Sequence, residues 1–193
     1  SLGILASSVV HTYDELLSGI STIREKTGYD KPLLVEEFLE GAEVTIGIIG
    51  NPSTSYSILP ILEEDYSALP EGLPKICGYD AKWNMESPYF QHLKSIRAQL
   101  PEGTENLIVY SSRRLFQRLQ CRDYARFDWR FDDHGNPKLL EVNPNPGWCW
   151  DGKLNIMAGF AGIRYSELLG QILQAAEERC GIVAKPQVTV AAN

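Results

Sequence analysis

The chain has 193 residues, and 25 acidic against 18 basic side chains give it a formal net charge of −7. Hydrophobic residues make up 44% and charged residues 22% of the chain, which is ordinary for a globular protein and excludes a disordered chain, a collagen-like repeat and a coiled coil. The acidic balance argues against a nucleic-acid binder, because such proteins need clustered positive charge.

The cysteines and the chain length indicate the kind of globular protein to expect. Four cysteines lie far apart without a C-x-x-C pair, which argues against a zinc cluster and favours reduced thiols in a cytoplasmic protein. No apolar run approaches the roughly 20 residues that a membrane-spanning helix needs. The length suits one domain. Because the first residue is Ser rather than Met, we expect the chain to be a piece of a longer protein.

The N-terminal half predicts one helix and three strands. Thr12 and Glu15 have the spacing of a capping box, apolar residues then recur at helical spacing, and Gly28 is a plausible stop. The expected strands are 33–38, 43–49 and 56–62. The Pro- and Gly-rich stretch 67–79 predicts a long surface loop.

The C-terminal half predicts helices around one pair of strands. The expected helices are one after Pro88 and those at 104–120, 155–161 and 166–179, with Gly181 as the last stop. The expected strands are 124–131 and 138–143. Strands and helices are interspersed without a regular β-α-β rhythm, which favours an α+β fold.

Strand 124–131 alternates without exception between apolar and polar side chains. One face carries Ala125, Phe127, Trp129 and Phe131, and the other carries Tyr124, Arg126, Asp128 and Arg130. On the partner strand, Glu141 and Asn143 alternate with apolar residues. This period of two indicates a hairpin with one polar face.

A two-residue turn at His134 and Gly135 would fix the register of this hairpin. Asp128 would then face Glu141, and Arg126 would face Asn143, all on the polar face. Facing carboxylates repel unless a cation lies between them, and Asp, Glu and Asn offer only oxygen, which suits Mg²⁺ rather than zinc. The alternative is a solvated polar face on which Arg126 pairs with Asp128 without a metal.

Three other segments carry weaker signals. The rigid loop 143–147 follows the strand, and its Gly147 N–H could stabilise an oxyanion. The carboxylates of 36–43 could bind a base or a ribose, or simply face solvent. Lys82 could contact phosphates or be an ordinary surface lysine, and residues 1–4 could end a phosphate-binding loop.

These motifs, in this order, resemble the ATP-grasp superfamily and within it the D-alanine–D-alanine ligase-like branch. The matching text is VEEFLEGAEVT at 35–45, YDAKW at 79–83, ARFD at 125–128 and LEVNPNPG at 140–147. The resemblance covers roughly residues 1–179. It implies an ATP-grasp fold of the α+β class, mainly an antiparallel sheet flanked by helices, lacking the N-terminal domain and part of the small lobe. Residues 1–38 would be the remainder of the small lobe, 39–181 the large lobe with the Mg-ATP site, and 182–193 a tail.

The resemblance also implies roles for particular residues. The implied ATP-binding residues are Ser1 and Gly3 in the phosphate loop, Glu36, Glu37 and Leu39 at the adenine, Glu43 at the ribose and Lys82 at the phosphates. The implied metal ligands are Asp128, Glu141 and Asn143, which would hold two Mg²⁺, with Mn²⁺ as an alternative. The implied catalytic groups are Arg126 and the Gly147 N–H, which would stabilise the acyl phosphate and the tetrahedral adduct.

Such enzymes phosphorylate a carboxylate with ATP and then let an amine displace phosphate to form an amide. After Gly147 the peptide ligases usually carry small hydroxyl residues, whereas this chain has WCWDGK at 148–153. We therefore expect Trp148 and Lys153 to bind the acceptor, with Lys153 receiving its carboxylate, and at least one Trp ring to be largely buried. The implied partners are amino-acid-like carboxylates and amines, without nucleic acid or membrane, and a homodimer is left open.

The leading hypothesis is an ATP- and Mg²⁺-dependent carboxylate–amine ligase, here as a catalytic-domain fragment. The second is a nucleotide-binding module or pseudoenzyme without turnover of its own, because the family's early ATP-grasp lysine precedes the point where this chain starts. A third, an interaction domain that kept the fold, would predict a decayed metal face, and the complete set of Arg126, Asp128, Glu141 and Asn143 argues against it.

Overall fold

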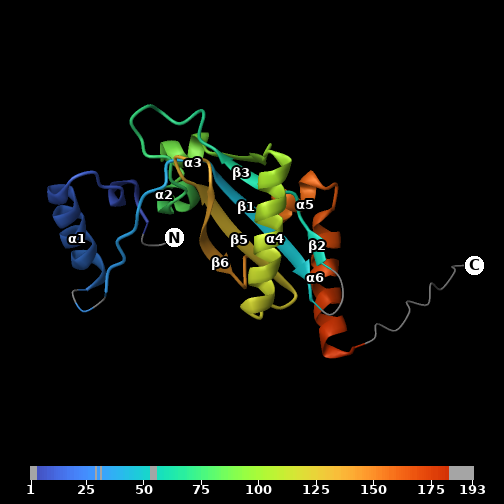
Figure 1. Cartoon of the computed structure of the whole chain (residues 1–193). Helices are drawn as coiled ribbons and strands as arrows, with labels where there is room; N and C mark the ends of the chain where they lie inside the picture. Colours follow the sequence, from blue (N-terminus) through green and yellow to red (C-terminus); the bar gives the residue numbers. More distant parts are fainter. Residues whose placement is uncertain (1–3, 29, 31, 53–55, 183–193) are drawn as a thin grey trace, which may run out of the picture. The chain divides into compact units, whose positions relative to one another are not determined.

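A computed structural model describes residues 4–28, 30, 32–52 and 56–182 (Figure 1). The chain divides into two compact units. Unit 1 comprises residues 1–42, 64–96 and 131–136, and unit 2 comprises residues 43–63, 97–130 and 137–193. The division into lobes at residue 38 and a tail from residue 182 stays a prediction, and residues 183–193 of that tail lie outside the described residues.

The strands form one sheet. They are β1 (Glu43–Gly50), β2 (Tyr56–Ile58), β3 (Leu62–Asp65), β4 (Lys94–Arg97), β5 (Tyr124–Phe131) and β6 (Pro137–Asn143). Their order is β4-β3-β1-β5-β6, and β2 also pairs with β1. Strand β1 is antiparallel to β2, β3 and β5. The predicted antiparallel sheet is confirmed.

The described helices differ widely in length. Unit 1 holds η1 (Ala6–Ser8), α1 (Tyr13–Thr27), α2 (Tyr79–Trp83) and α3 (Pro88–His92), and unit 2 holds α4 (Glu102–Arg118), α5 (Lys153–Phe160) and α6 (Tyr165–Cys180). Among the described helices, none combines the length and the apolar character that crossing a membrane requires.

The sequence signals for helix ends are confirmed. The Thr12 hydroxyl accepts a hydrogen bond from the Glu15 N–H at 3.2 Å, and the Glu15 carboxylate accepts one from the Thr12 N–H at 3.2 Å. Gly28 caps the end of α1. Gly181 ends α6 in the left-handed conformation, at φ +68°.

Two strand predictions need correction. Residues 33–38 form no described strand, because an extended segment becomes a strand only when a neighbouring strand pairs with it. The expected strand 56–62 is two strands, β2 and β3, which pair with opposite ends of β1. Pro60 lies between them and lacks the N–H that a continuous ladder needs. The short elements η1, α2 and β4 were not predicted, since each is too brief to show a period.

The apolar face of β5 packs against α4 (Figure 1). The Phe127 ring lies 6.5 Å from the Phe116 ring, measured between centroids. The Trp129 indole N–H donates to the Ser112 hydroxyl at 3.1 Å. The predicted alternation of faces along β5 is therefore confirmed.

The opposite face of the sheet is covered in part by α5. Gly47 of β1 pairs with Arg126 of β5, so the Arg126 side chain and the open position above Gly47 lie on this face. A Cβ on Gly47 would lie 2.9 Å from a Leu154 methyl and 3.2 Å from the Met157 methyl, both on α5. A side chain at this position would therefore force the side chains of α5 to shift. The N-terminus of α5 consequently borders the polar part of the same face.

Candidate active site

Arg126 holds Asp128 on the polar face of β5. The Arg126 Nε donates to Asp128 Oδ1 at 2.9 Å, and Nη2 donates to Oδ2 at 2.7 Å. Thr45, which pairs with Asp128 across β1 and β5, donates its hydroxyl to Oδ1 at 2.9 Å. Asp128 is buried, so these bonds compensate for the water it has lost. The carboxylate is fixed in position by groups from two strands.

The charges around Asp128 keep it ionised. Burial would raise the pKa of this carboxyl, but the hydrogen bonds and charge of Arg126, the charge of Lys153 and the Thr45 hydroxyl lower it below its ordinary value. Lys153 is the first residue of α5. The next residue, Leu154, packs against Gly47, which pairs with Arg126 across β1 and β5, so the first turn of α5 lies beside the polar face.

Glu141 of β6 shares the guanidinium of Arg126. The Arg126 Nη2 lies 3.4 Å from Glu141 Oε1, and the Glu141 side chain is 60% exposed. One cationic group thus contacts both carboxylates, which confirms the expectation that Asp128 and Glu141 converge. Arg126 also pairs with Asp128 as the alternative hypothesis expected.

The turn of this hairpin is longer than predicted. The Gly135 N–H donates to the Asp132 carbonyl at 3.1 Å, and the Asp132 N–H donates to the Asn136 carbonyl at 3.0 Å. The loop therefore contains three residues, and the predicted two-residue turn at His134 and Gly135 is wrong. In a two-residue turn His134 would need a positive φ, whereas here Gly135 alone takes one, at +77°. The convergence of Asp128 and Glu141 rests on their contacts with Arg126 and not on the predicted register.

The loop after β6 is held by its own side chains. The Asn143 Oδ1 accepts a hydrogen bond from the Asn145 N–H at 3.0 Å, which forms an Asx turn. The Tyr124 hydroxyl donates to Asn145 Oδ1. Gly147, expected to be catalytic through its N–H, is exposed at the end of this loop.

The predicted metal ligands fit Mg²⁺ by their chemistry. Asp128 and Glu141 offer carboxylate oxygens beside the same cationic group, and Asn143 offers an amide oxygen. Within the described part of the chain, no group of three or more His, Cys, Asp or Glu side chains has a metal-binding arrangement. The set would therefore depend on Asn143 as its third ligand.

The loop of Trp148 borders the polar face at the Tyr124 end. The Trp148 ring contacts the Tyr124 ring edge-on, with 6.1 Å between centroids. The Tyr165 hydroxyl donates to the Trp148 carbonyl at 2.7 Å. Trp148 is 51% exposed and Trp150 is 73% exposed, so the expectation that one ring would be largely buried is wrong. Hydrogen bonds to its backbone, rather than burial of its rings, position this loop.

The residues expected to bind ATP fall into both units. In unit 1, Glu36, Glu37 and Lys82 are exposed, and Leu39 is partly buried. In unit 2, Glu43 is buried and its Oε2 lies 3.4 Å from Arg130 Nη1. Ser1 and Gly3, assigned to the phosphate loop, lie outside the described residues.

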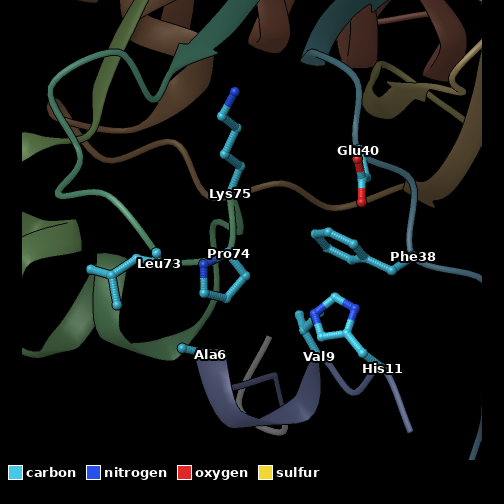
Figure 2. A pocket seen from close by; sticks show the side chains of 9 residues that line it. Ala6, Val9, His11, Phe38, Glu40, Leu73, Pro74 and Lys75 are labelled. Carbon is cyan, nitrogen blue, oxygen red and sulfur yellow. The ribbon is translucent and has the colours of Figure 1, made fainter.

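Unit 1 contains a cavity of about 480 Å³ that the sequence did not predict (Figure 2). Phe38 and Pro74 line it together with the small apolar side chains of Ala6, Val9 and Leu73, and the polar lining comprises His11, Glu40 and Lys75. The cavity brings together three segments that are distant in sequence and carry no shared motif. No local pattern could therefore have indicated it.

Comparison with known proteins identifies the family. Residues 1–174 match the family described as D-ala D-ala ligase C-terminus. The chain belongs to this family. A D-alanine–D-alanine ligase of Pelotomaculum thermopropionicum is 31% identical over 92% of this chain and 51% of the relative. An uncharacterized protein of Sinorhizobium fredii is 32% identical over 89% of this chain and 48% of the relative.

Solved structures agree with this membership in the D-ala D-ala ligase C-terminus family. The D-alanine–D-alanine ligase from Bacillus anthracis, solved in complex with ATP, is 26% identical with a TM-score of 0.64, over 88% of this chain and 48% of that chain. A second structure of the Bacillus anthracis ligase has a TM-score of 0.65 and 28% identity, over 88% and 50% of the two chains. The predicted ATP-grasp ligase fold is confirmed. The chain spans about half the length of the relatives it matches.

Sequence reasoning missed two buried polar pairs of this ligase-family chain. Thr45 supports Asp128, and Glu43 pairs with Arg130 across the same two strands. A usable signal existed, because Thr45 lies within β1 between the apolar residues Val44 and Ile46. A buried hydroxyl needs a hydrogen-bond partner, so its presence there indicates a polar group on the neighbouring strand.

Proposed function

We propose that this chain is the catalytic part of an ATP- and Mg²⁺-dependent carboxylate–amine ligase. Such an enzyme phosphorylates a carboxylate with ATP and forms an amide when an amine displaces the phosphate. The observation that supports this most is the Arg126 guanidinium, which contacts both Asp128 and Glu141 on a face that Lys153 borders. Membership of the D-ala D-ala ligase C-terminus family supports this reaction class for the chain.

The proposal gives each polar residue of this face a task. Asp128, Glu141 and Asn143 would hold Mg²⁺, which when bound neutralises charge on the phosphates. Arg126 would stabilise the negative charge of the acyl phosphate, since a planar guanidinium can donate two parallel hydrogen bonds to phosphate oxygens. The Gly147 N–H would donate to the oxyanion formed when the amine attacks.

ATP would be bound mainly by residues of unit 1. Glu36 would accept a hydrogen bond from the adenine amino group, and the backbone of Glu37 and Leu39 would contact the base edge. Lys82 would contact the phosphates with Ser1 and Gly3, and the family resemblance assigns the ribose to Glu43. The cavity beside Phe38 supports a base in this unit, because it offers an apolar wall next to the same segment (Figure 2).

The substrates would be amino-acid-like molecules. Lys153 would receive the acceptor carboxylate and Trp148 would contact the rest of the acceptor. All four cysteines are free thiols, which supports a cytoplasmic enzyme.

Release of ADP tests the proposal. The full-length protein encoded by the gene is incubated with ATP, Mg²⁺ and pairs of amino acids, and Asp128→Asn and Glu141→Gln are compared with it. We expect both variants to lose ADP release. Asp123→Asn is the matched control, because Asp123 is also held by two bonds from an arginine, Arg179, but is not assigned to the site.

The same experiment separates the second hypothesis from the first. ATP binding without ADP release for any pair of amino acids would favour a nucleotide-binding module without turnover. Unchanged ADP release in Asp128→Asn and Glu141→Gln would contradict the metal assignment.

A further inference from the structure

Trp148 presents a large apolar ring to solvent beside the polar face. Trp148 is 51% exposed, although an indole is one of the largest apolar groups that a protein can bury. The ring is nevertheless held in place. The Tyr124 ring contacts it edge-on at an interplanar angle of 80°, and the Tyr165 hydroxyl donates a hydrogen bond to the Trp148 carbonyl.

Tyr124 contacts the Trp148 ring and lies on the same strand as Arg126 of the candidate active site. It lies two residues before Arg126 on β5, so the two side chains point to the same face. Two residues of a strand span about 7 Å. Tyr124 is itself buried, and its hydroxyl is bound to Asn145, so it offers a fixed support for Trp148.

Lys153 borders the same face from α5. Its place follows from the next residue, Leu154, which packs against Gly47, the residue that pairs with Arg126 across β1 and β5. The supported indole lies at the Tyr124 end of this face, and the first turn of α5 packs against the strands beside Arg126. A lysine ammonium binds a carboxylate, and an indole ring binds a flat apolar group. A ligand that suits both side chains would carry these two groups on a short carbon skeleton.

We propose that the acceptor amine of this ligase is an amino acid with an aromatic side chain, which packs on Trp148 while Lys153 binds its carboxylate. This inference rests on the proposed function and names its acceptor class. An alanine side chain would leave most of the indole in water, whereas an aromatic ring would cover it. One apolar group more or less in a binding pocket typically changes kcat/KM by about tenfold or more.

Acceptor competition with matched tryptophan variants tests the inference. The full-length protein receives ATP, Mg²⁺, a common carboxylate donor and either alanine or phenylalanine of each hand as the acceptor. We expect kcat/KM to favour phenylalanine by about tenfold or more. Trp148→Ala should abolish this preference by raising the KM for phenylalanine, and Trp148→Phe should retain part of it.

Trp150→Ala is the matched control. Trp150 belongs to the same loop and is 73% exposed, and its carbonyl, which the substitution retains, accepts a hydrogen bond from Asn155. We expect this variant to keep the preference for phenylalanine. Circular dichroism of each variant establishes that the fold is retained.

The outcomes distinguish this inference from the proposed function. ADP release that favours alanine, or a preference for phenylalanine that survives Trp148→Ala in a folded protein, would overturn the aromatic acceptor and leave the ligase intact. No ADP release with any acceptor would overturn the proposed function, and the inference with it.

Discussion

Replacing Arg126 by Met removes the principal partner of a buried carboxylate. Asp128 is only 8% exposed, and it loses the hydrogen bonds from the Arg126 Nε and Nη2 atoms, which are 2.9 and 2.7 Å long. Removing one partner of a buried ion pair typically costs about 3–5 kcal/mol. Because the Thr45 hydroxyl and the charge of Lys153 remain, we expect a loss at the lower end of this range, about 3 kcal/mol of unfolding free energy.

Urea denaturation followed by circular dichroism measures this loss. At pH 7 the midpoint of Arg126→Met should fall without a change in slope. The effect should depend on pH, because Arg126 lowers the pKa of Asp128. A group whose pKa is lowered by folding contributes stability above its unfolded pKa, about 3.9, and loses it as the pH falls through its folded pKa. The difference between the two proteins should therefore shrink below about pH 4.

An exposed pair provides the control. Arg164 Nη2 lies 2.6 Å from Glu167 Oε1, closer than in the Arg126–Asp128 pair, but the two side chains are 78% and 45% exposed. Arg164→Met should leave the midpoint within experimental error, since exposed pairs contribute little. Equal midpoints for Arg126→Met and the original protein, or a difference that stays constant down to pH 3, would refute the reasoning.

Three further predictions concern the fold. Gly41→Ala should destabilise the protein by about 1–3 kcal/mol in thermal unfolding, because the new Cβ would lie 2.5 Å from a backbone carbonyl oxygen, whereas Gly159→Ala in α5 meets nothing within 4 Å and should be neutral or stabilising. Phe116→Ala should cost about 3–5 kcal/mol in urea denaturation, because this ring is fully buried; a loss under 1 kcal/mol would contradict its place in the core. Asp123→Asn should lower the thermal midpoint more at pH 7 than at pH 3, because the hydrogen bond from Arg179 lowers the pKa of Asp123 and this contribution is lost as the pH falls toward the folded pKa; an equal effect at both pH values would contradict this.

The sequence predicted those parts of the fold whose signals are local and periodic. The alternation along β5 identified both its apolar and its polar face, and the pair Thr12 and Glu15 identified the start of α1. The same alternation carries no information about a neighbouring strand. The segment 33–38 was likewise predicted to be a strand from its own residues alone, and no described strand supplies a partner.

Features that depend on a single residue's conformation or on distant segments were harder to predict. Gly135 takes a positive φ and His134 does not, so the loop has three residues and the predicted two-residue turn is wrong. The bond from Thr45 to Asp128 joins residues 83 positions apart, and only the pairing of β1 with β5 brings them together. Trp148 stays exposed because its loop is fixed through backbone groups, which its side-chain type does not reveal.

Transfer of labelled oxygen tests the ligase proposal most directly. The full-length protein is given ATP, Mg²⁺, an acceptor amine and amino acids, D-alanine among them, whose carboxylates carry oxygen-18. If the carboxylate attacks the terminal phosphate of ATP, the inorganic phosphate released with ADP should carry one labelled oxygen, in equal amount to the amide product. Label in AMP instead of phosphate, or amide formation with unlabelled phosphate, would contradict the proposed reaction.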